Sequence, residues 1–106
     1  MSLVVARKRP PKLPDPLGRS RARLAGGRVR DSRHAEERKV QRDVDIYVVE
    51  KVITTGWHEA GEDRYKEEHG SWTYAIRGKT VDGVDIRVVI AFDEEDFLVI
   101  VTARPP

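Results

Sequence analysis

The sequence of 106 residues contains no cysteine. This absence excludes a disulfide framework, a cysteine-ligated zinc or iron–sulfur site and a cysteine nucleophile. Long apolar runs are also missing, because the longest one near the N-terminus, Leu3–Ala6, is too short for a signal-peptide core or a membrane span. We therefore expect a soluble protein of the cytoplasm with no membrane partner.

Charge is distributed unevenly along the chain. Residues 1–30 contain nine Arg or Lys and a single acid, which gives them a formal charge of +8. Residues 31–106 contain the other 11 Arg or Lys and 17 Asp or Glu, which gives −6. The near-neutral total of +2 therefore joins a basic arm to an acidic body.

The basic arm, residues 1–30, holds four of the six prolines, and its sparse apolar residues follow no sustained period. Such a segment buries too little surface to offset the entropy cost of ordering it, so we predict that it is mostly disordered when free. Against a polyanion, the stretch Arg19–Arg23 could form a turn of helix. Its cations favour polyanions such as RNA through counterion release, with Arg19, Arg21 and Arg23 as candidate contacts. The same charges suit an acidic protein partner, including the acidic body of another copy.

The acidic body has the length of one small domain and begins with two predicted helices. Asp31 is an N-cap residue in front of a run of helix formers, which predicts a polar helix over residues 32–40. Asp43 is a second N-cap residue, and apolar side chains along one arc predict a helix over residues 44–55 that ends at Gly56. The many β-branched residues there favour a strand, but the length and the lack of alternation favour a helix.

The remainder of the body predicts strands joined by hairpins. An irregular strand over residues 57–64 runs into a charged loop over 62–70. Apolar and polar residues alternate from Ser71 onward, and two runs rich in Val and Ile follow at 84–92 and 97–103. The predicted fold class is therefore α+β, with two N-terminal helices packed on an antiparallel sheet of three or four strands.

Two registers are possible for the first hairpin. A two-residue turn at 82–83 would pair Ile76 with Val89 and would place an arginine among apolar side chains. A three-residue loop over 82–84 pairs Ile76 with Ile90 and keeps one face of the sheet apolar. Because a buried face specifies the register strongly, we predict the three-residue loop.

A four-residue turn over 93–96 then adds the last strand to this sheet. One face gathers apolar residues and is expected to lie under the helices: Trp72, Tyr74, Ile76, Ile86, Val88, Ile90, Phe92, Phe97, Val99, Val101 and Ala103. The other face is basic at one end and apolar at the other: Ala75, Arg77, Lys79, Arg87, Val89, Ala91, Leu98, Ile100, Thr102 and Arg104.

The basic end of that second face is the first candidate site. Guanidinium groups clustered on a sheet can clamp a phosphodiester and stabilise charge that develops at phosphorus. The candidate set consists of Arg77, Lys79, Arg87, Thr102 and Arg104. The alternative is a solubilising face whose cations balance the acidic body.

His34 is the candidate for acid–base chemistry, because imidazole titrates near neutral pH. Arg38 lies one helical turn later on the same predicted face and would position a phosphate. Each residue has a simpler interpretation, as a solvated surface histidine and as an arginine paired with a neighbouring acid.

No metal site and no cofactor are predicted. The other histidines and the acids near them follow no standard ligand spacing: His58, His69, Glu59, Glu67 and Glu68. Trp57 and Trp72 could stack on nucleobases, but tryptophans of so small a domain more often belong to the core.

Short motifs in a fixed order resemble a known bacterial family. They are His34, Glu37-Arg38, the helix Val44–Gly56, Tyr74, Arg77-Gly78, Gly83, Arg87-Val88-Val89 and Val99-Ile100-Val101-Thr102. This order is similar to that of domain-of-unknown-function family 4258 (DUF4258), and the resemblance covers roughly residues 33–104.

The resemblance implies a compact helix–helix–sheet domain similar to the small ribonuclease toxins of the RelE and barnase type. By that analogy, five residues would surround an RNA-cleaving site: His34, Arg38, Arg77, Arg87 and Thr102. Lys79, Arg104 and the arginines of the arm would add RNA-binding charge.

Our leading hypothesis is a toxin-like RNA-binding domain that acts as a metal-independent endoribonuclease of a toxin–antitoxin system. The ribose 2′-hydroxyl would be the nucleophile, His34 the general acid or base, and RNA and an antitoxin protein the partners. The alternative is a non-catalytic protein-interaction module, or an inactive toxin remnant that keeps the fold.

Overall fold

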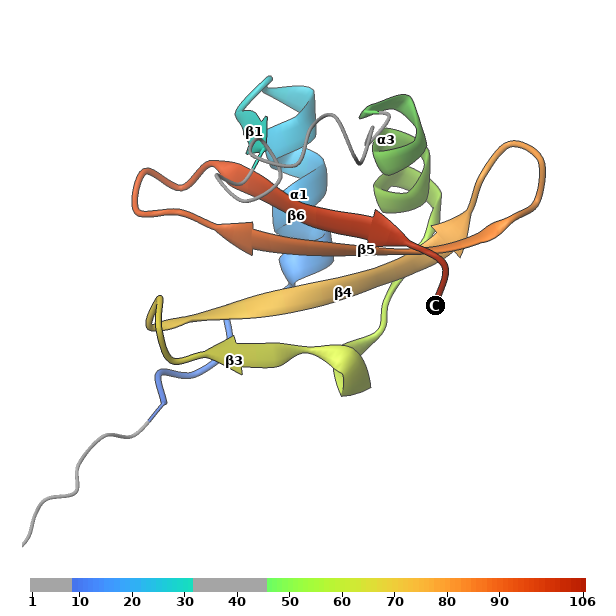
Figure 1. Cartoon of the computed structure of the whole chain (residues 1–106). Helices are drawn as coiled ribbons and strands as arrows, with labels where there is room; N and C mark the ends of the chain where they lie inside the picture. Colours follow the sequence, from blue (N-terminus) through green and yellow to red (C-terminus); the bar gives the residue numbers. More distant parts are fainter. Residues whose placement is uncertain (1–8, 32–45) are drawn as a thin grey trace, which may run out of the picture.

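The computed structural model describes residues 9–31 and 46–106. Within these ranges the chain forms two α-helices, one 3₁₀ turn and six strands, so the predicted α+β class is confirmed (Figure 1). The helices are α1 (Pro16–Ala25), α3 (Ile46–Thr55) and the 3₁₀ turn η2 (Ala60–Glu62). The strands are β1 (Val29–Asp31), β2 (Trp57–His58), β3 (Arg64–Lys66), β4 (Ser71–Lys79), β5 (Asp85–Phe92) and β6 (Leu98–Arg104). The helix predicted over 32–40 lies outside the described residues.

The strands form one mixed sheet in the order β1-β6-β5-β4-β2, and β3 pairs with β4 beside β2. Every pair is antiparallel except β1 with β6, which is parallel. The prediction of a purely antiparallel sheet of three or four strands is wrong, because β1 comes from the predicted arm and adds a parallel strand to the edge. None of the helices in the described ranges is long and apolar enough to cross a membrane.

For the described part of the arm, residues 9–30, the prediction of disorder is wrong. The Asp15 carboxylate accepts a hydrogen bond of 3.0 Å from the Gly18 amide, and Pro16 occupies the first turn, so α1 starts with a cap and a suitable proline. Leu17 and Leu24 are partly buried against the core. Tertiary packing of this kind, rather than local propensity, supplies most of the stability of a short helix.

Helix α3 confirms the predicted second helix over its described residues. Val49, Val52 and Ile53 are fully buried, which is the i, i+3, i+4 spacing of a helix face. The helix ends where β4 passes beneath it, and a Cβ on Gly56 would lie 2.2 Å from the carbonyl oxygen of Arg77. Glycine at 56 is therefore required by the close approach of two backbones.

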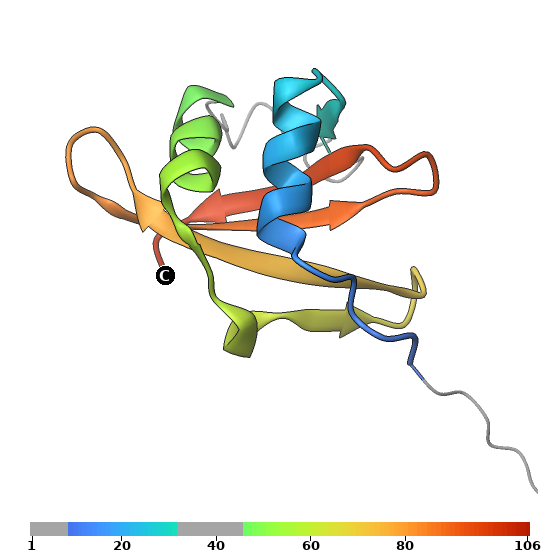
Figure 2. The same ribbon diagram turned by 180° about the vertical axis from the view of Figure 1, so that it is seen from behind.

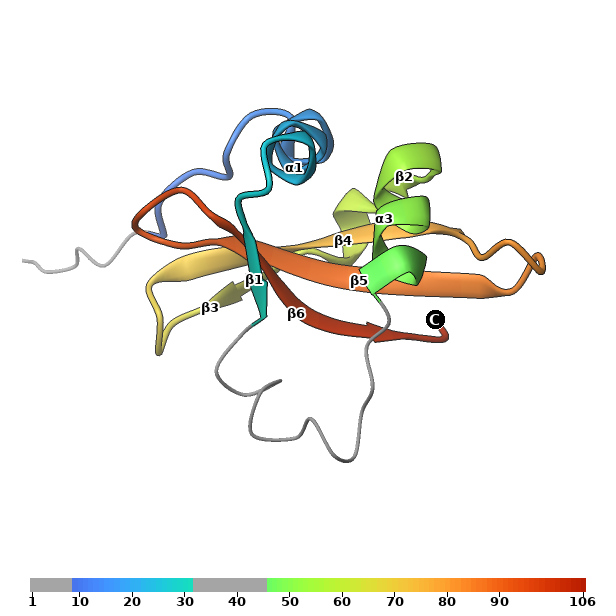
Figure 3. The same cartoon turned by 90° about the horizontal axis from the view of Figure 1, so that it is seen from above.

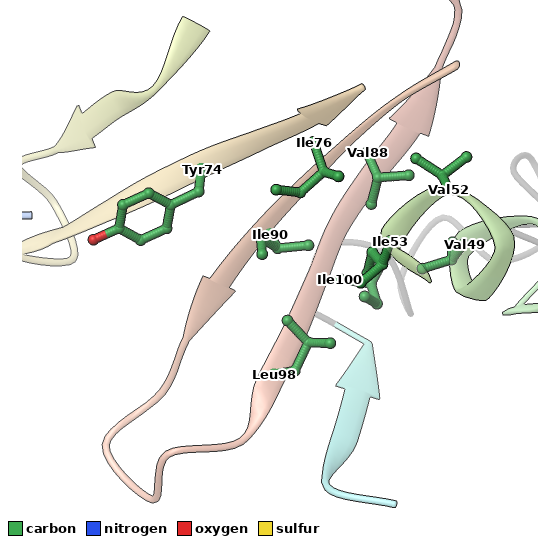
Figure 4. Close-up of a cluster of buried hydrophobic side chains, with 9 residues drawn as sticks. All are labelled: Val49, Val52, Ile53, Tyr74, Ile76, Val88, Ile90, Leu98 and Ile100. Atoms are coloured by element: carbon green, nitrogen blue, oxygen red, sulfur yellow. The ribbon is translucent and has the colours of Figure 1, made fainter. Parts of the chain in front are cut away.

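The core lies between the helices and one face of the sheet (Figures 2 and 4). Its fully buried members are Val49, Val52, Ile53, Tyr74, Ile76, Val88, Ile90, Leu98 and Ile100. Figure 2 shows α1 and α3 side by side above the strands, and Figure 3 looks down onto the same side of the sheet. The opposite face, which points away from both helices, is called the distal face below.

The first hairpin has the predicted loop length but a different register. Ile76 pairs with Val88 and not with Ile90, because the loop closes between Thr80 and Val84. The Thr80 hydroxyl accepts a hydrogen bond from the Val84 amide, and Gly83 adopts a positive φ of 81° at the end of the loop. The pairing slips by two residues, so every side chain of β4 and β5 stays on its predicted face.

The second hairpin is where the predicted faces are wrong. Phe92 pairs with Leu98, because the Asp93 carboxylate accepts hydrogen bonds from the amides of Glu95 and Phe97 and so lengthens the turn. Leu98 and Ile100 therefore enter the core, and Phe97 and Val99 leave it. A register shift between Val89 and Ile90 then returns Ala103 to the core face, and Thr102 and Arg104 to the distal face.

The Asp63 side chain supplies a hydrogen-bond acceptor to β4 between strands β2 and β3. The Glu59 amide donates to the Ala75 carbonyl, and the η2 turn then takes the backbone away from β4. The buried Asp63 carboxylate replaces the missing backbone acceptor by accepting from the Ala75 amide at 3.0 Å. It also lies 2.9 Å from both His58 Nε2 and Lys12 Nζ.

Replacing Asp63 with alanine is expected to lower the free energy of unfolding by about 2–4 kcal/mol, because the Ala75 amide would lose its buried acceptor. Asn at this position keeps an amide oxygen for that amide and should cost less. Urea denaturation followed by circular dichroism measures both variants. Equal midpoints for Asp63→Ala and the wild type would show that water replaces the carboxylate.

Candidate active site on the distal face of the sheet

Arg77 and Arg87 form the centre of the candidate site. They are directly opposite each other in the antiparallel pair of β4 and β5. Their chain neighbours Ile76 and Val88 are buried in the core, so the two arginine side chains lie on the distal face, as predicted. Two like charges in such proximity require a counter-ion.

That counter-ion is Glu59, which the sequence predicted neither as a catalytic nor as an RNA-binding residue. Its carboxylate accepts hydrogen bonds from Arg77 Nη1 at 2.9 Å, from Arg87 Nε at 2.7 Å and from Arg87 Nη2 at 3.2 Å. The side chains of Glu59 and Arg87 are each 16% exposed and that of Arg77 is 24% exposed. The group is thus partly shielded yet reachable from solvent.

Asp85 completes the cluster of four residues, called the Glu59 cluster below: Glu59, Arg77, Asp85 and Arg87. Arg77 binds Asp85 with two nitrogens, Nε at 3.2 Å and Nη2 at 2.9 Å, in the bidentate geometry that favours arginine over lysine. Each guanidinium has five N–H donors. The carboxylates take three of them on Arg77 and two on Arg87.

The cluster shifts the pKa of every member in the direction of its charged form. The hydrogen bonds from Arg87, with its positive charge and that of Arg77, hold the pKa of Glu59 below its ordinary value of 4.5, against the opposing effect of desolvation. The hydrogen bonds from Arg77 likewise lower the pKa of Asp85. The guanidinium pKa values are raised, that of Arg87 mainly by Glu59 and that of Arg77 mainly by Asp85. All four groups are therefore charged at neutral pH.

The other predicted residues of this face surround the cluster. Arg104 is opposite Arg87 in the sheet, Thr102 is opposite Val89, and Lys79 is opposite Asp85. Lys79 and Arg104 are exposed at the surface. The structure therefore brings together all five candidate residues that lie on β4, β5 and β6.

The arginines of α1 are not part of this site, because α1 packs on the opposite side of the sheet. Arg21 donates to the carbonyl oxygens of Ile53 and Gly56 at 2.9 and 3.2 Å, and so caps the C-terminus of α3. Arg23 donates to the backbone and the carboxylate of Asp96, and Arg19 Nη1 lies 3.6 Å from that carboxylate. These side chains fasten α1 to the body, and their predicted contact with RNA stays a prediction.

Further arginines of the predicted arm bind the acidic turn between β5 and β6. Arg30 Nη1 lies 3.0 Å from Asp93 and 3.3 Å from Glu95, and its guanidinium lies 3.8 Å from the centre of the Phe97 ring. Arg28 donates to the Glu95 carbonyl. Much of the basic arm therefore neutralises the acidic body of its own chain.

His34 and Arg38, the predicted acid–base and phosphate-binding residues, lie outside the described residues. His58 belongs to the Asp63 interaction and contacts Tyr74 edge-on with 6.1 Å between ring centres. Among the residues that the structure describes, no group of three or more His, Asp or Glu side chains is arranged to hold a metal ion.

An ionised carboxylate can accept a proton from a hydroxyl group, and guanidinium groups beside it can hold an adjacent oxyanion. The sequence did not predict a role for Glu59 in this site, because its position beside the arginines depends on the tertiary structure. It follows a two-residue strand, and only the pairing of β2 with β4 places it beside Arg77.

Residues 32–104 match the family described as domain of unknown function (DUF4258), and the chain belongs to that family. The match covers α3 and strands β2 to β6, including the whole Glu59 cluster. Helix α1 and strand β1 precede it. No protein of curated function matches the chain.

Proposed function

We propose that this member of the DUF4258 family is a toxin-like RNA-binding domain that cleaves RNA without a metal ion, as the toxin of a toxin–antitoxin system. A fold similar to the RelE and barnase type is part of the proposal. The supporting observation is the ionised Glu59 carboxylate held between Arg77 and Arg87 on the distal face. The proposal assigns this carboxylate as the base and the two guanidinium groups as the phosphate-binding groups.

In the proposed reaction, Glu59 takes the proton of the ribose 2′-hydroxyl while the 2′-oxygen forms a bond to the adjacent phosphorus. Arg77 and Arg87 hold the non-bridging phosphate oxygens and stabilise the negative charge that grows on them. The bond from phosphorus to the 5′-oxygen breaks, and that oxygen accepts a proton from a general acid. The products are a 2′,3′-cyclic phosphate and a 5′-hydroxyl.

His34 is the candidate for the general acid, and Arg38 for a further phosphate contact, on the residue patterns of the sequence. Thr102 lies on the same sheet face as the cluster and would hydrogen-bond the phosphate or the ribose. Lys79 and Arg104 add positive charge along the path of the RNA backbone. An acidic antitoxin would bind the same cations.

One observation favours the alternative, a non-catalytic interaction module. Glu59 and Asp85 already balance the charges of Arg77 and Arg87, as they would in a purely structural ion-pair cluster. The tip of the hairpin between β4 and β5 also exposes Val81 and Val84, which are 86% and 52% exposed. Apolar residues on a protruding hairpin suit a protein partner.

Induced expression in a bacterial host separates the two proposals. The wild type is expected to arrest growth and leave fragmented total RNA, and Arg87→Ala or Arg77→Ala should relieve both effects because each removes a phosphate contact. Glu62→Gln is the matched control, since Glu62 lies 3.9 Å from Arg87 and makes no close bond with it.

Arrest that survives both arginine replacements would place the toxic site elsewhere on the chain. Normal growth with intact RNA, at high soluble expression of the wild type, would favour the interaction module.

A further inference from the structure

Trp57 stands out on the distal face because this residue is 54% exposed. It is directly opposite Arg77 in the pair of β2 and β4, and it precedes Glu59 by two residues. Residues opposite each other in an antiparallel pair have Cβ atoms about 4.5–5.5 Å apart on the same face. The indole therefore extends the Glu59 cluster at the edge of the sheet.

The other tryptophan shows what a structural role looks like in this protein. Trp72 Nε1 donates to the Pro10 carbonyl at 2.8 Å, and its ring packs edge-on against Tyr65 with 5.6 Å between ring centres. The ammonium group of Lys12 lies 5.1 Å from the centre of the same ring. Trp72 thus holds the N-terminal segment, whereas more than half of the Trp57 surface is left to solvent.

We propose that Trp57 is a nucleobase-stacking residue and that the substrate class is single-stranded RNA; this inference rests on the proposed function. An aromatic ring beside two phosphate-binding arginines has the pairing of elements that single-stranded nucleic acid requires, a stacking surface and a positively charged path. Arg77 holds the phosphate, and the base attached to the neighbouring ribose stacks on Trp57.

The preference for single-stranded over double-stranded RNA follows from the same geometry. In a duplex, each base is covered on both sides by its neighbours, and it can meet a protein ring only after it leaves the stack. Trp57 is part of a two-residue strand at the sheet edge and offers its ring without any rearrangement of the chain. Unpaired segments therefore fit the site, and base-paired segments do not.

The test is a titration of the full-length protein with a hexauridylate oligonucleotide, followed by tryptophan fluorescence, and with an RNA duplex of equal length. Glu59→Gln serves as the parent chain so that the oligonucleotide is not cleaved. We expect saturable quenching that is absent in Trp57→Phe, which isolates the Trp57 signal from that of Trp72. Trp57→Ala should weaken binding by about ten- to a hundredfold, and Trp57→Phe by much less.

Val84→Ala is the control, because it removes another exposed apolar side chain outside the proposed stack and should leave binding unchanged. Equal affinity of Trp57→Ala and its parent for the oligonucleotide would overturn the stacking role while leaving RNA binding in place. Equal binding of the duplex would overturn the single-strand assignment. No binding of either RNA by the parent, together with normal growth on expression of the wild type, would overturn the proposed function itself.

Discussion

Replacing Glu59 with glutamine is expected to lower the rate of RNA cleavage by about a hundred- to ten-thousandfold, the contribution typical of a general base. Glutamine has nearly the same shape, and its amide oxygen can still accept hydrogen bonds from Arg77 and Arg87, but it cannot take up the 2′-hydroxyl proton. The measurement is cleavage of a labelled single-stranded RNA by purified protein in the presence of EDTA. Glu62→Gln, one turn away on η2, is the matched control.

The pH dependence gives a second measurement on the same residue. The arginines hold the pKa of Glu59 below its ordinary value of 4.5, so the carboxylate is ionised above that pH and becomes protonated only as the pH falls through the lowered pKa. Cleavage should therefore persist down to about pH 4.5, and the contribution of Glu59 to folding stability should be lost over the same low-pH range.

Replacing Arg87 with glutamine removes the main cause of the lowered pKa and should move the acid limb of the cleavage profile to higher pH. If the Glu59→Gln variant cleaved RNA at the wild-type rate, another group would have to be the base. In that case the cluster holds the phosphate and orders the sheet edge, and the acid limb should not respond to Arg87→Gln.

Deleting residues 1–25 is expected to destabilise the protein by about 3–5 kcal/mol, a large share of the roughly 5–15 kcal/mol that stabilises a domain of this size. The deletion removes the cover that Leu17 and Leu24 provide for the core, the Arg21 cap on α3 and the bond from Arg23 to Asp96. The measurement is thermal unfolding followed by circular dichroism.

Arg21→Ala, which removes only the cap on α3, is the control, and it should lower the unfolding temperature by much less than the deletion. If the deletion of 1–25 left the unfolding temperature unchanged, α1 would contribute nothing to the stability of the remaining domain. That result would agree with the family match, which begins at residue 32, after α1 and β1.

The main gap between sequence and structure concerns the basic arm. Its composition is typical of disorder when the segment is considered alone, and it does contain a capped helix whose signal is easy to overlook. Asp15, Pro16 and Gly26 mark the ends of α1, as an N-cap, a first-turn proline and a C-terminal glycine do. Long-range contacts order residues 9–30, since Arg23 and Arg30 bind acids some 65–75 residues further along the chain.

The predicted strand registers were wrong for a different reason. The face of β4 and β5 follows from period-two alternation, which survives a slip of two residues. The faces of Leu98 and Ile100 depend on a single residue in the preceding turn, and the Asp93 side chain decides its length by bonding to two backbone amides. A pattern of alternate Val and Ile carries no information about which of its two faces is buried.

The sequence by itself determined the α+β class, the family, the second helix with its glycine stop, and the grouping of Arg77, Lys79 and Arg87 on one face. These features depend on local spacing, which the order of residues records directly. Only the tertiary structure decided that Glu59 sits between the two arginines and that Trp57 is exposed beside them. Both depend on which strand lies next to β4, and strand neighbours are chosen by the burial of the whole core.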